Sequence, residues 1–110
     1  DSHNIIVVGT NEEDMAFAAN QVVALNGGIV VAQNGAVTGE VPLAVAGIMS
    51  DEPLVEVNRK LEEAKEKAFA AGVNRNIDPF MTLSFMALPV IPTLRITTRG
   101  VFDVTTQRYI

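Results

Sequence analysis

Apolar residues recur at helical spacing in the first part of the chain. A helix is expected to begin after a capping box formed by Thr10 and Glu13 and to run to about Asn26. Gly27-Gly28 is expected to end it. Its apolar positions are three or four residues apart, as on one helix face: Met15, Ala18, Ala19 and Val22.

A longer helix is predicted in the middle of the chain. Ser50 is typical of an N-cap, with Asp51 and Glu52 in the first turn, and Gly72 is expected to end the helix. Charged residues occupy most of its other positions, so the helix should lie on a sheet with its outer side in water. Its apolar stripe consists of Leu54, Val57, Leu61, Ala64, Ala68 and Ala71.

Strand-type patterns fill the rest of the chain. The β-branched run from Asn4 to Gly9 and the run from Ile29 to Ala32 predict two buried strands. Asn34-Gly35 predicts a hairpin turn, because both residues tolerate a positive φ, and the return strand should end near Pro42. In the last third, alternation predicts further strands around a turn at Arg99-Gly100: Met81, Leu83 and Phe85, then Leu94 and Ile96, then Phe102 and Val104.

These elements predict a single α+β domain over residues 1–110. We expect two layers: a mixed β-sheet of about five or six strands, with two helices on one face. Such a domain would bury one face of each helix against the sheet.

Composition narrows the function classes. The net charge of −5 and the isoelectric point of about 4.7 argue against a nucleic-acid partner and against an anionic membrane surface. The chain has no cysteine, which excludes disulfides and thiolate chemistry. Its 48% hydrophobic content is high for a small domain and indicates that some apolar surface belongs to a neighbouring domain or subunit.

The polar cluster Asp1-Ser2-His3-Asn4 leads directly into the first predicted strand. Such an abrupt start is typical of a cut inside a longer protein. Successive residues of an extended chain point to opposite faces, so Asp1, Ser2 and His3 cannot converge as a catalytic triad. Either the cluster is a polar lead-in to the strand, or Ser2, His3 and Asn4 contribute to a site that another domain completes. His3 is the only histidine, which excludes a histidine-rich metal site within the chain.

Other candidate groups have simpler explanations. Asp51 and Glu52 suit the start of a helix better than acid–base catalysis. Glu40 is expected on the solvent side of a hairpin strand. The glycines match neither phosphate-binding motif, because the sequence contains no GxGxxG and no GxxxxGK[ST].

The segment from Pro79 to Pro92 is the longest apolar stretch, and its three prolines and two hydroxyl residues argue against a membrane span. It is either a core strand or an interface with another domain or subunit. Its methionines and phenylalanines would suit an adaptable packing surface. The interface candidates are Phe80, Met81, Phe85 and Met86.

Three blocks of residues together resemble the C-terminal domain of bacterial adenine deaminases, in the metal-dependent amidohydrolase superfamily. The resemblance spans almost the whole chain. The blocks are Asp1-Ser2-His3-Asn4-Ile5-Ile6-Val7-Val8-Gly9-Thr10-Asn11 with Asp14-Met15; Gly27-Gly28-Ile29-Val30-Val31 with Pro42-Leu43 and Ala46-Gly47-Ile48-Met49-Ser50-Asp51-Glu52-Pro53; and 78–92, which begins Asp78-Pro79-Phe80-Met81.

This resemblance implies a cytoplasmic purine-salvage enzyme that hydrolyses adenine to hypoxanthine and ammonia. In that family a divalent metal (manganese, iron or zinc) generates the attacking hydroxide. The metal ligands, including a His-x-His pair, lie on a barrel that precedes this domain, and none of those motifs occurs here. We therefore expect no catalytic, cofactor-binding or metal-binding residue within the chain, and no activity from the chain alone.

The resemblance leaves three roles open for the domain. It could close over the barrel so that Ser2, His3 and Asn4 approach the purine. It could be an assembly module that packs on the barrel or forms a homo-oligomer through the apolar segment. It could also be an independent small-ligand-binding domain.

Overall fold

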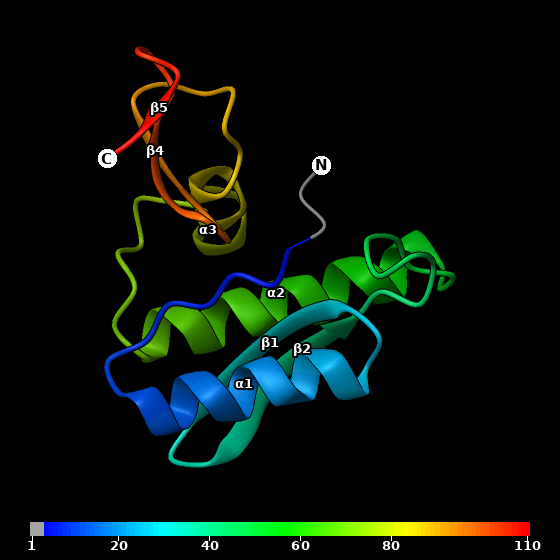
Figure 1. Cartoon of the computed structure of the whole chain (residues 1–110). Helices are drawn as coiled ribbons and strands as arrows, with labels where there is room; N and C mark the ends of the chain where they lie inside the picture. The colour runs from blue at the N-terminus through cyan, green and yellow to red at the C-terminus, as the bar shows by residue number, and fades with distance from the viewer. Residues whose placement is uncertain (1–3) are drawn as a thin grey trace.

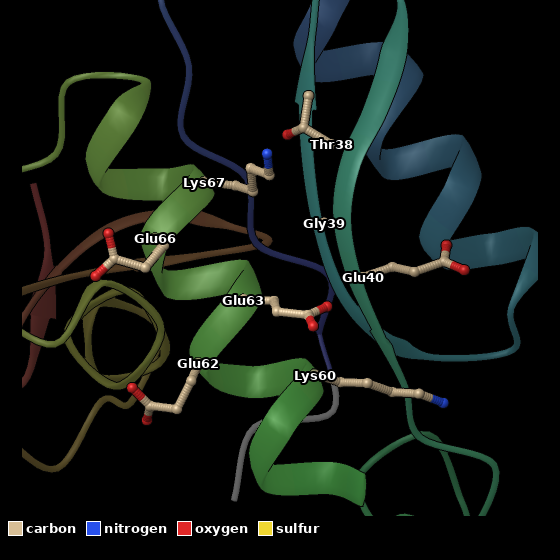
Figure 2. Close-up of a pocket in the computed structure, with 8 residues that line it drawn as sticks. All are labelled: Thr38, Gly39, Glu40, Lys60, Glu62, Glu63, Glu66 and Lys67. Carbon is tan, nitrogen blue, oxygen red and sulfur yellow. The ribbon is translucent and has the colours of Figure 1, made fainter.

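A β-hairpin between two helices forms the first half of the fold (Figure 1). The structure is a computed structural model that describes residues 4–110. The strands of the hairpin lie between α1 on one side and α2 on the other in both views (Figures 1 and 2). This half consists of α1 (Glu12–Ala24), β1 (Gly28–Gln33), β2 (Ala36–Pro42) and α2 (Leu54–Ala70).

The hairpin turn is confirmed where the sequence predicts it. Asn34 and Gly35 both have positive φ, 54° and 73°, which matches the twist of the two flanking strands. β1 and β2 pair in antiparallel register, with Ile29 opposite Val41 and an irregularity between Val31 and Ala32.

Both helices of this half form, but their starts differ from the prediction. Asn11, not Thr10, caps α1: its side chain accepts a hydrogen bond from the Asp14 amide at 2.8 Å. Asparagine is at least as good an N-cap residue as threonine, so the cap lies at Asn11, one residue after the predicted Thr10. Likewise, the Ser50 hydroxyl accepts from the Glu52 amide in a turn before α2, and the helix begins only after Pro53.

The helix α2 packs closely on β2. Ala64 and Ala68 of the predicted stripe are buried, whereas Leu54, at the other end of the stripe, is 82% exposed. A Cβ atom built on Gly39 would lie 3.0 Å from the Ala64 Cα atom, so only glycine allows this approach. The buried apolar residues of 4–110 are Val41, Ala64, Ala68 and Ala87, together with Pro79.

The second half contains a helix where the sequence predicts a strand. The residues from Met81 to Phe85 belong to α3 (Pro79–Met86). Asp78 caps this helix by accepting from the Phe80 and Met81 amides, and Pro79 suits the first turn, where its missing N–H costs nothing. These start signals outweigh the apolar alternation, which by itself predicted a strand.

A small antiparallel sheet follows α3. It consists of β3 (Leu94–Thr97), β4 (Gly100–Asp103) and β5 (Arg108–Tyr109), in the order β3-β4-β5. The two halves are joined by an ion pair in which the Lys65 ammonium of α2 lies 3.1 Å from the Asp78 carboxylate at the start of α3.

The α+β class is confirmed, and residues 4–110 contain five strands. The single mixed sheet was wrong: the strands form two separate antiparallel sheets, and three helices accompany them instead of two. The stretch from Asn4 to Gly9 is not a strand in this chain. The loss of these two predicted strands, at 4–9 and 81–85, explains why no larger sheet forms.

The chain exposes more surface than a compact protein of its size. Its accessible surface is 7445 Å², whereas a compact monomer of this mass exposes about 5,900 Å². The radius of gyration is 14.5 Å, against about 13 Å for a compact domain of this length. Within residues 4–110, no helix is both long enough and apolar enough to cross a membrane.

Candidate functional site

The outward side of α3 is the clearest candidate surface. Met81, Phe85 and Met86 are 55%, 42% and 38% exposed, and Phe80 is half-buried. Met81 and Phe85 are four residues apart, so they share one side of the helix. The structure thus places three of the four interface candidates in solvent.

The inward side of α3 is apolar as well. Pro79 and Ala87 are buried, and Leu83 is half-buried. Apart from the exposed hydroxyl residues Thr82 and Ser84, α3 is apolar, whereas a helix with one side in water normally carries a polar outer face. The outward side of α3 is therefore suited to a protein contact.

The sheet of the second half carries a bare apolar face. Ile96 pairs with Val101, and Leu94 lies two residues before Ile96, so the three side chains share one face. All three are exposed. On the opposite face, the Phe102 and Tyr109 rings meet edge to face with their centroids 5.1 Å apart.

A second apolar cluster lies where β2 leads into α2. Its exposed members are Val45, Ile48, Met49, Leu54 and Val55. The loop that carries the first three is held near the end of α1, since Gly27 packs on Gly47 and its carbonyl accepts from the Leu43 amide at 3.2 Å. This cluster is fixed in place although its side chains are open to solvent.

An open groove of about 500 Å³ runs along the contact of α2 with β2 and is lined by residues of both (Figure 2). Lys60 and Glu63 extend from α2 toward the strands, whereas Glu62 and Glu66 point away from them (Figure 2). The Lys60 ammonium is held at 2.7 Å by the Glu52 carboxylate. Most lining residues are charged and none has an aliphatic or aromatic hydrophobic side chain, unlike a typical small-molecule site, which is lined mainly by such side chains. The complete lining is Thr38, Gly39, Glu40, Lys60, Glu62, Glu63, Glu66 and Lys67.

The polar candidates do not converge on a reactive centre within the described residues. Asn4 is exposed, and Ser2 and His3 lie outside the described residues. Glu40 is exposed on β2, as its simpler explanation predicts, whereas Asp51 and Glu52 are exposed in the turn before α2 and not in its first turn. In the described stretch 4–110, no group of three or more His, Cys, Asp or Glu side chains could hold a metal ion, so these residues do not fit a divalent metal site.

Among residues 4–110, three carboxylates have a pKa below the ordinary value, and each has a structural role. Hydrogen bonds from the Asn11 side chain and from the Gly35 and Asn34 amides lower the pKa of Asp14. The Met81 amide and the Lys65 ammonium lower the pKa of Asp78, and the Thr106 and Thr105 amides lower that of Asp103. A carboxylate held in its charged form is a poor general acid or base near neutral pH, so none of these is a catalytic candidate.

Sequence reasoning missed two of the apolar surfaces. The Val45–Val55 cluster falls in a segment interpreted as a connector and a helix start, and Leu54 was assigned to a buried stripe. The exposure of the apolar face of the second sheet could not be predicted, because alternation shows that a strand has an apolar face but not whether another element covers it. The high hydrophobic content was the one signal of uncovered surface.

Comparisons with known proteins agree with these surfaces belonging to a larger molecule. Residues 1–108 match the adenine deaminase C-terminal domain family. The chain is 46% identical over all of its length to the adenine deaminase of Bacillus subtilis and 52% identical over 94% of it to that of Sinorhizobium fredii. It is 49% identical over all of its length to the adenine deaminase of Leuconostoc citreum. It spans 18–20% of the length of these relatives. The chain therefore belongs to the adenine deaminase C-terminal domain family.

Proposed function

We propose that this chain is the C-terminal domain of an enzyme that hydrolyses adenine to hypoxanthine and ammonia, in purine salvage. The family match over residues 1–108 carries this proposal, supported by relatives named adenine deaminase. The domain serves the reaction by packing on the catalytic part of the protein, and the isolated chain is inactive.

The chemistry itself belongs to the rest of the enzyme. Hydrolysis needs an activated water that attacks the C6 carbon of adenine while a proton reaches the departing nitrogen, and a bound divalent metal such as manganese, iron or zinc supplies hydroxide of this kind. The chain has one histidine and no cysteine. We therefore assign the metal ligands and the acid–base group to an amidohydrolase barrel outside this chain.

The role of the domain is to cover and stabilise that barrel. Its uncovered apolar surface supports this role, because an excess of roughly 1,500 Å² over a compact monomer is more than the roughly 800 Å² that each partner buries in a standard protein interface. The side of α3 that carries Met81, Phe85 and Met86, together with the half-buried Phe80, is the contact we propose. A second copy of the enzyme in a cytoplasmic homo-oligomer is the alternative occupant of this surface.

The activity is tested on the full-length protein. Incubation with adenine should release hypoxanthine and ammonia in equal amounts. Chromatography measures the hypoxanthine, and an ammonia assay measures the ammonia. Removal of the metal with a chelator should abolish the reaction, and returning manganese, iron or zinc should restore it. A protein that is folded and metal-loaded but leaves adenine unchanged would contradict the proposal.

The packing role has its own test. Phe85→Asp in the full-length protein places a charge on the proposed contact, and we expect a lower thermal midpoint and lower activity. Thr98→Asp adds the same charge to the exposed β3–β4 turn and serves as the matched control. Equal behaviour of the two variants would rule out α3 as the contact. Light scattering shows whether Phe85→Asp also dissociates an oligomer.

A further inference from the structure

Residues 5–9 have the sequence of a strand but no strand partner. Ile5, Ile6, Val7 and Val8 are a continuous β-branched run, which strongly favours extended backbone in a sheet. Within residues 4–110, no backbone hydrogen bond joins this stretch to another element, and no β-ladder includes it. Its backbone donors and acceptors are therefore open to a partner.

The pattern of this run is that of a strand covered on both faces. A strand with one wet face alternates apolar and polar residues, whereas a continuous apolar run is typical of a strand between two layers. In this chain, however, Ile5 is 52% and Val8 is 72% exposed. The cover that the run requires is thus missing on part of its length.

The strand β1 also has an unpaired edge. β1 pairs with β2 along one edge, and within the described residues nothing pairs with its other edge. β1 also carries a continuous apolar run, Ile29-Val30-Val31-Ala32, and lies between α1 and α2 (Figure 1). It has the surroundings of a central strand but the pairing of an edge strand.

The connection through α1 sets the direction of the two stretches. The Asp14 carboxylate near the start of α1 binds the Asn34 and Gly35 amides at the end of β1, at 3.1 and 2.9 Å. Residues 5–9 therefore run toward the same end of the hairpin as β1 does. If residues 5–9 were a strand next to β1, the connection through α1 would make the two strands parallel, and such crossovers are right-handed.

Resting on the proposed function, we propose that residues 5–9 form a strand that pairs in parallel with the open edge of β1. The other edge of this strand receives a strand from the part of the same enzyme outside this chain. The first sheet is thereby extended from two strands to at least four, and Ile5 and Val8 become covered.

We assign the partner strand to the same protein because most of the length of such a protein lies outside this chain. The chain spans about a fifth of its relatives, so roughly four-fifths of such a protein is available to supply the strand. An uncovered, apolar, strand-type stretch would otherwise invite aggregation, which proteins prevent by pairing or covering such edges.

Hydrogen exchange of the full-length protein, read by mass spectrometry, tests the pairing. Amides of residues 5–9 should exchange about as slowly as those of β1 and on the order of 100-fold more slowly than those of the Thr98–Arg99 turn. Exchange as fast as in that turn would overturn the inference. Activity on adenine is measured on the same sample, so slow exchange without activity would contradict the proposed function alone, and activity with fast exchange would contradict this inference alone.

A pair of variants sharpens the test. Val7→Pro removes one amide donor and introduces a ring that a paired strand does not accommodate, whereas Val7→Thr keeps the amide and the β-branched shape. We expect Val7→Pro to speed exchange by at least about tenfold in residues 5–9 and β1, with Val7→Thr unchanged. Unchanged exchange in β1 of a folded Val7→Pro protein would contradict pairing with β1. If Val7→Pro does not fold, the wild-type exchange decides the question.

Discussion

The Asp14 carboxylate accepts a hydrogen bond from the Gly35 amide at 2.9 Å, across 21 residues of sequence. This bond ties the start of α1 to the turn of the β1–β2 hairpin. A second bond from the Asn34 amide at 3.1 Å reaches the other carboxylate oxygen. One side chain therefore sets the position of the helix relative to both strands.

This arrangement makes stability depend on pH. Because hydrogen bonds hold the pKa of Asp14 below its ordinary value of 3.8, its stabilising effect is complete above that pH and is lost as the pH falls through the lower, folded value. The thermal midpoint should therefore fall between about pH 6 and about pH 3 more steeply for the wild type than for Asp14→Asn. Equal pH profiles would show that the carboxylate charge has no role. Asp78 and Asp103 titrate in the same direction and form a common background in both proteins.

The contact of Gly39 with Ala64 predicts a costly small-to-large change. Gly39→Ala places a methyl group 3.0 Å from the Ala64 Cα atom, and this backbone atom can move only if α2 shifts. We expect a loss of about 1–3 kcal/mol in the free energy of unfolding. Glu40→Ala, at the next and exposed position of β2, should change it by less than about 0.5 kcal/mol. Denaturant unfolding measures both, and a neutral Gly39→Ala would show that the layers are not closely packed.

Asp78 has two functions that can be separated by substitution. It caps α3 through the Phe80 and Met81 amides and pairs with Lys65 of α2. Asp78→Ala should cost about 1 kcal/mol through loss of the cap. Lys65→Met, which keeps most of the aliphatic stem, should cost well under about 1 kcal/mol because exposed ion pairs contribute little. If Lys65→Met proves the more damaging in denaturant unfolding, the ion pair and not the cap holds α3.

The amino-terminal cluster gives a prediction about catalysis. If Ser2, His3 and Asn4 approach the purine pocket of the full-length enzyme, His3→Ala should lower kcat/KM for adenine by well over threefold. Thr98→Ala, in the exposed β3–β4 turn, should leave it unchanged. A His3→Ala value within about threefold of the wild type, under about 1 kcal/mol of transition-state energy, would remove the cluster from the reaction.

The local elements of the first half were predictable because their signals are local. Asn34-Gly35, the Ala64–Ala68 stripe and the glycines after α1 each act through the conformation of a few neighbouring residues. Asp78 also carries a local signal, an N-cap before Pro79, whereas the strand prediction for Met81 to Phe85 rested on apolar alternation alone. The strand predicted around Ile5 to Val8 was wrong for a different reason. A β-branched sequence favours extended backbone, but a strand forms only when another strand is available to pair with it.

The candidate surface was predictable in composition but not in extent. The sequence singled out the methionines and phenylalanines of α3 as interface candidates, and the structure shows which of these side chains are exposed to solvent. The Val45–Val55 cluster and the face formed by Leu94, Ile96 and Val101 depend on which elements pack together. That information is non-local, so residue patterns could not supply it.

Oxidation of methionine by dilute hydrogen peroxide tests the central claim that α3 is covered in the full-length enzyme. Met81 is 55% and Met86 is 38% exposed in this chain, whereas Met15 is half-buried and serves as the internal reference. Peptide mass spectrometry should show that Met81 and Met86 oxidise at least about tenfold more slowly, relative to Met15, in the full-length enzyme than in the 110-residue chain. Equal relative rates in the two proteins would contradict the claim, because they would leave the outward side of α3 in solvent.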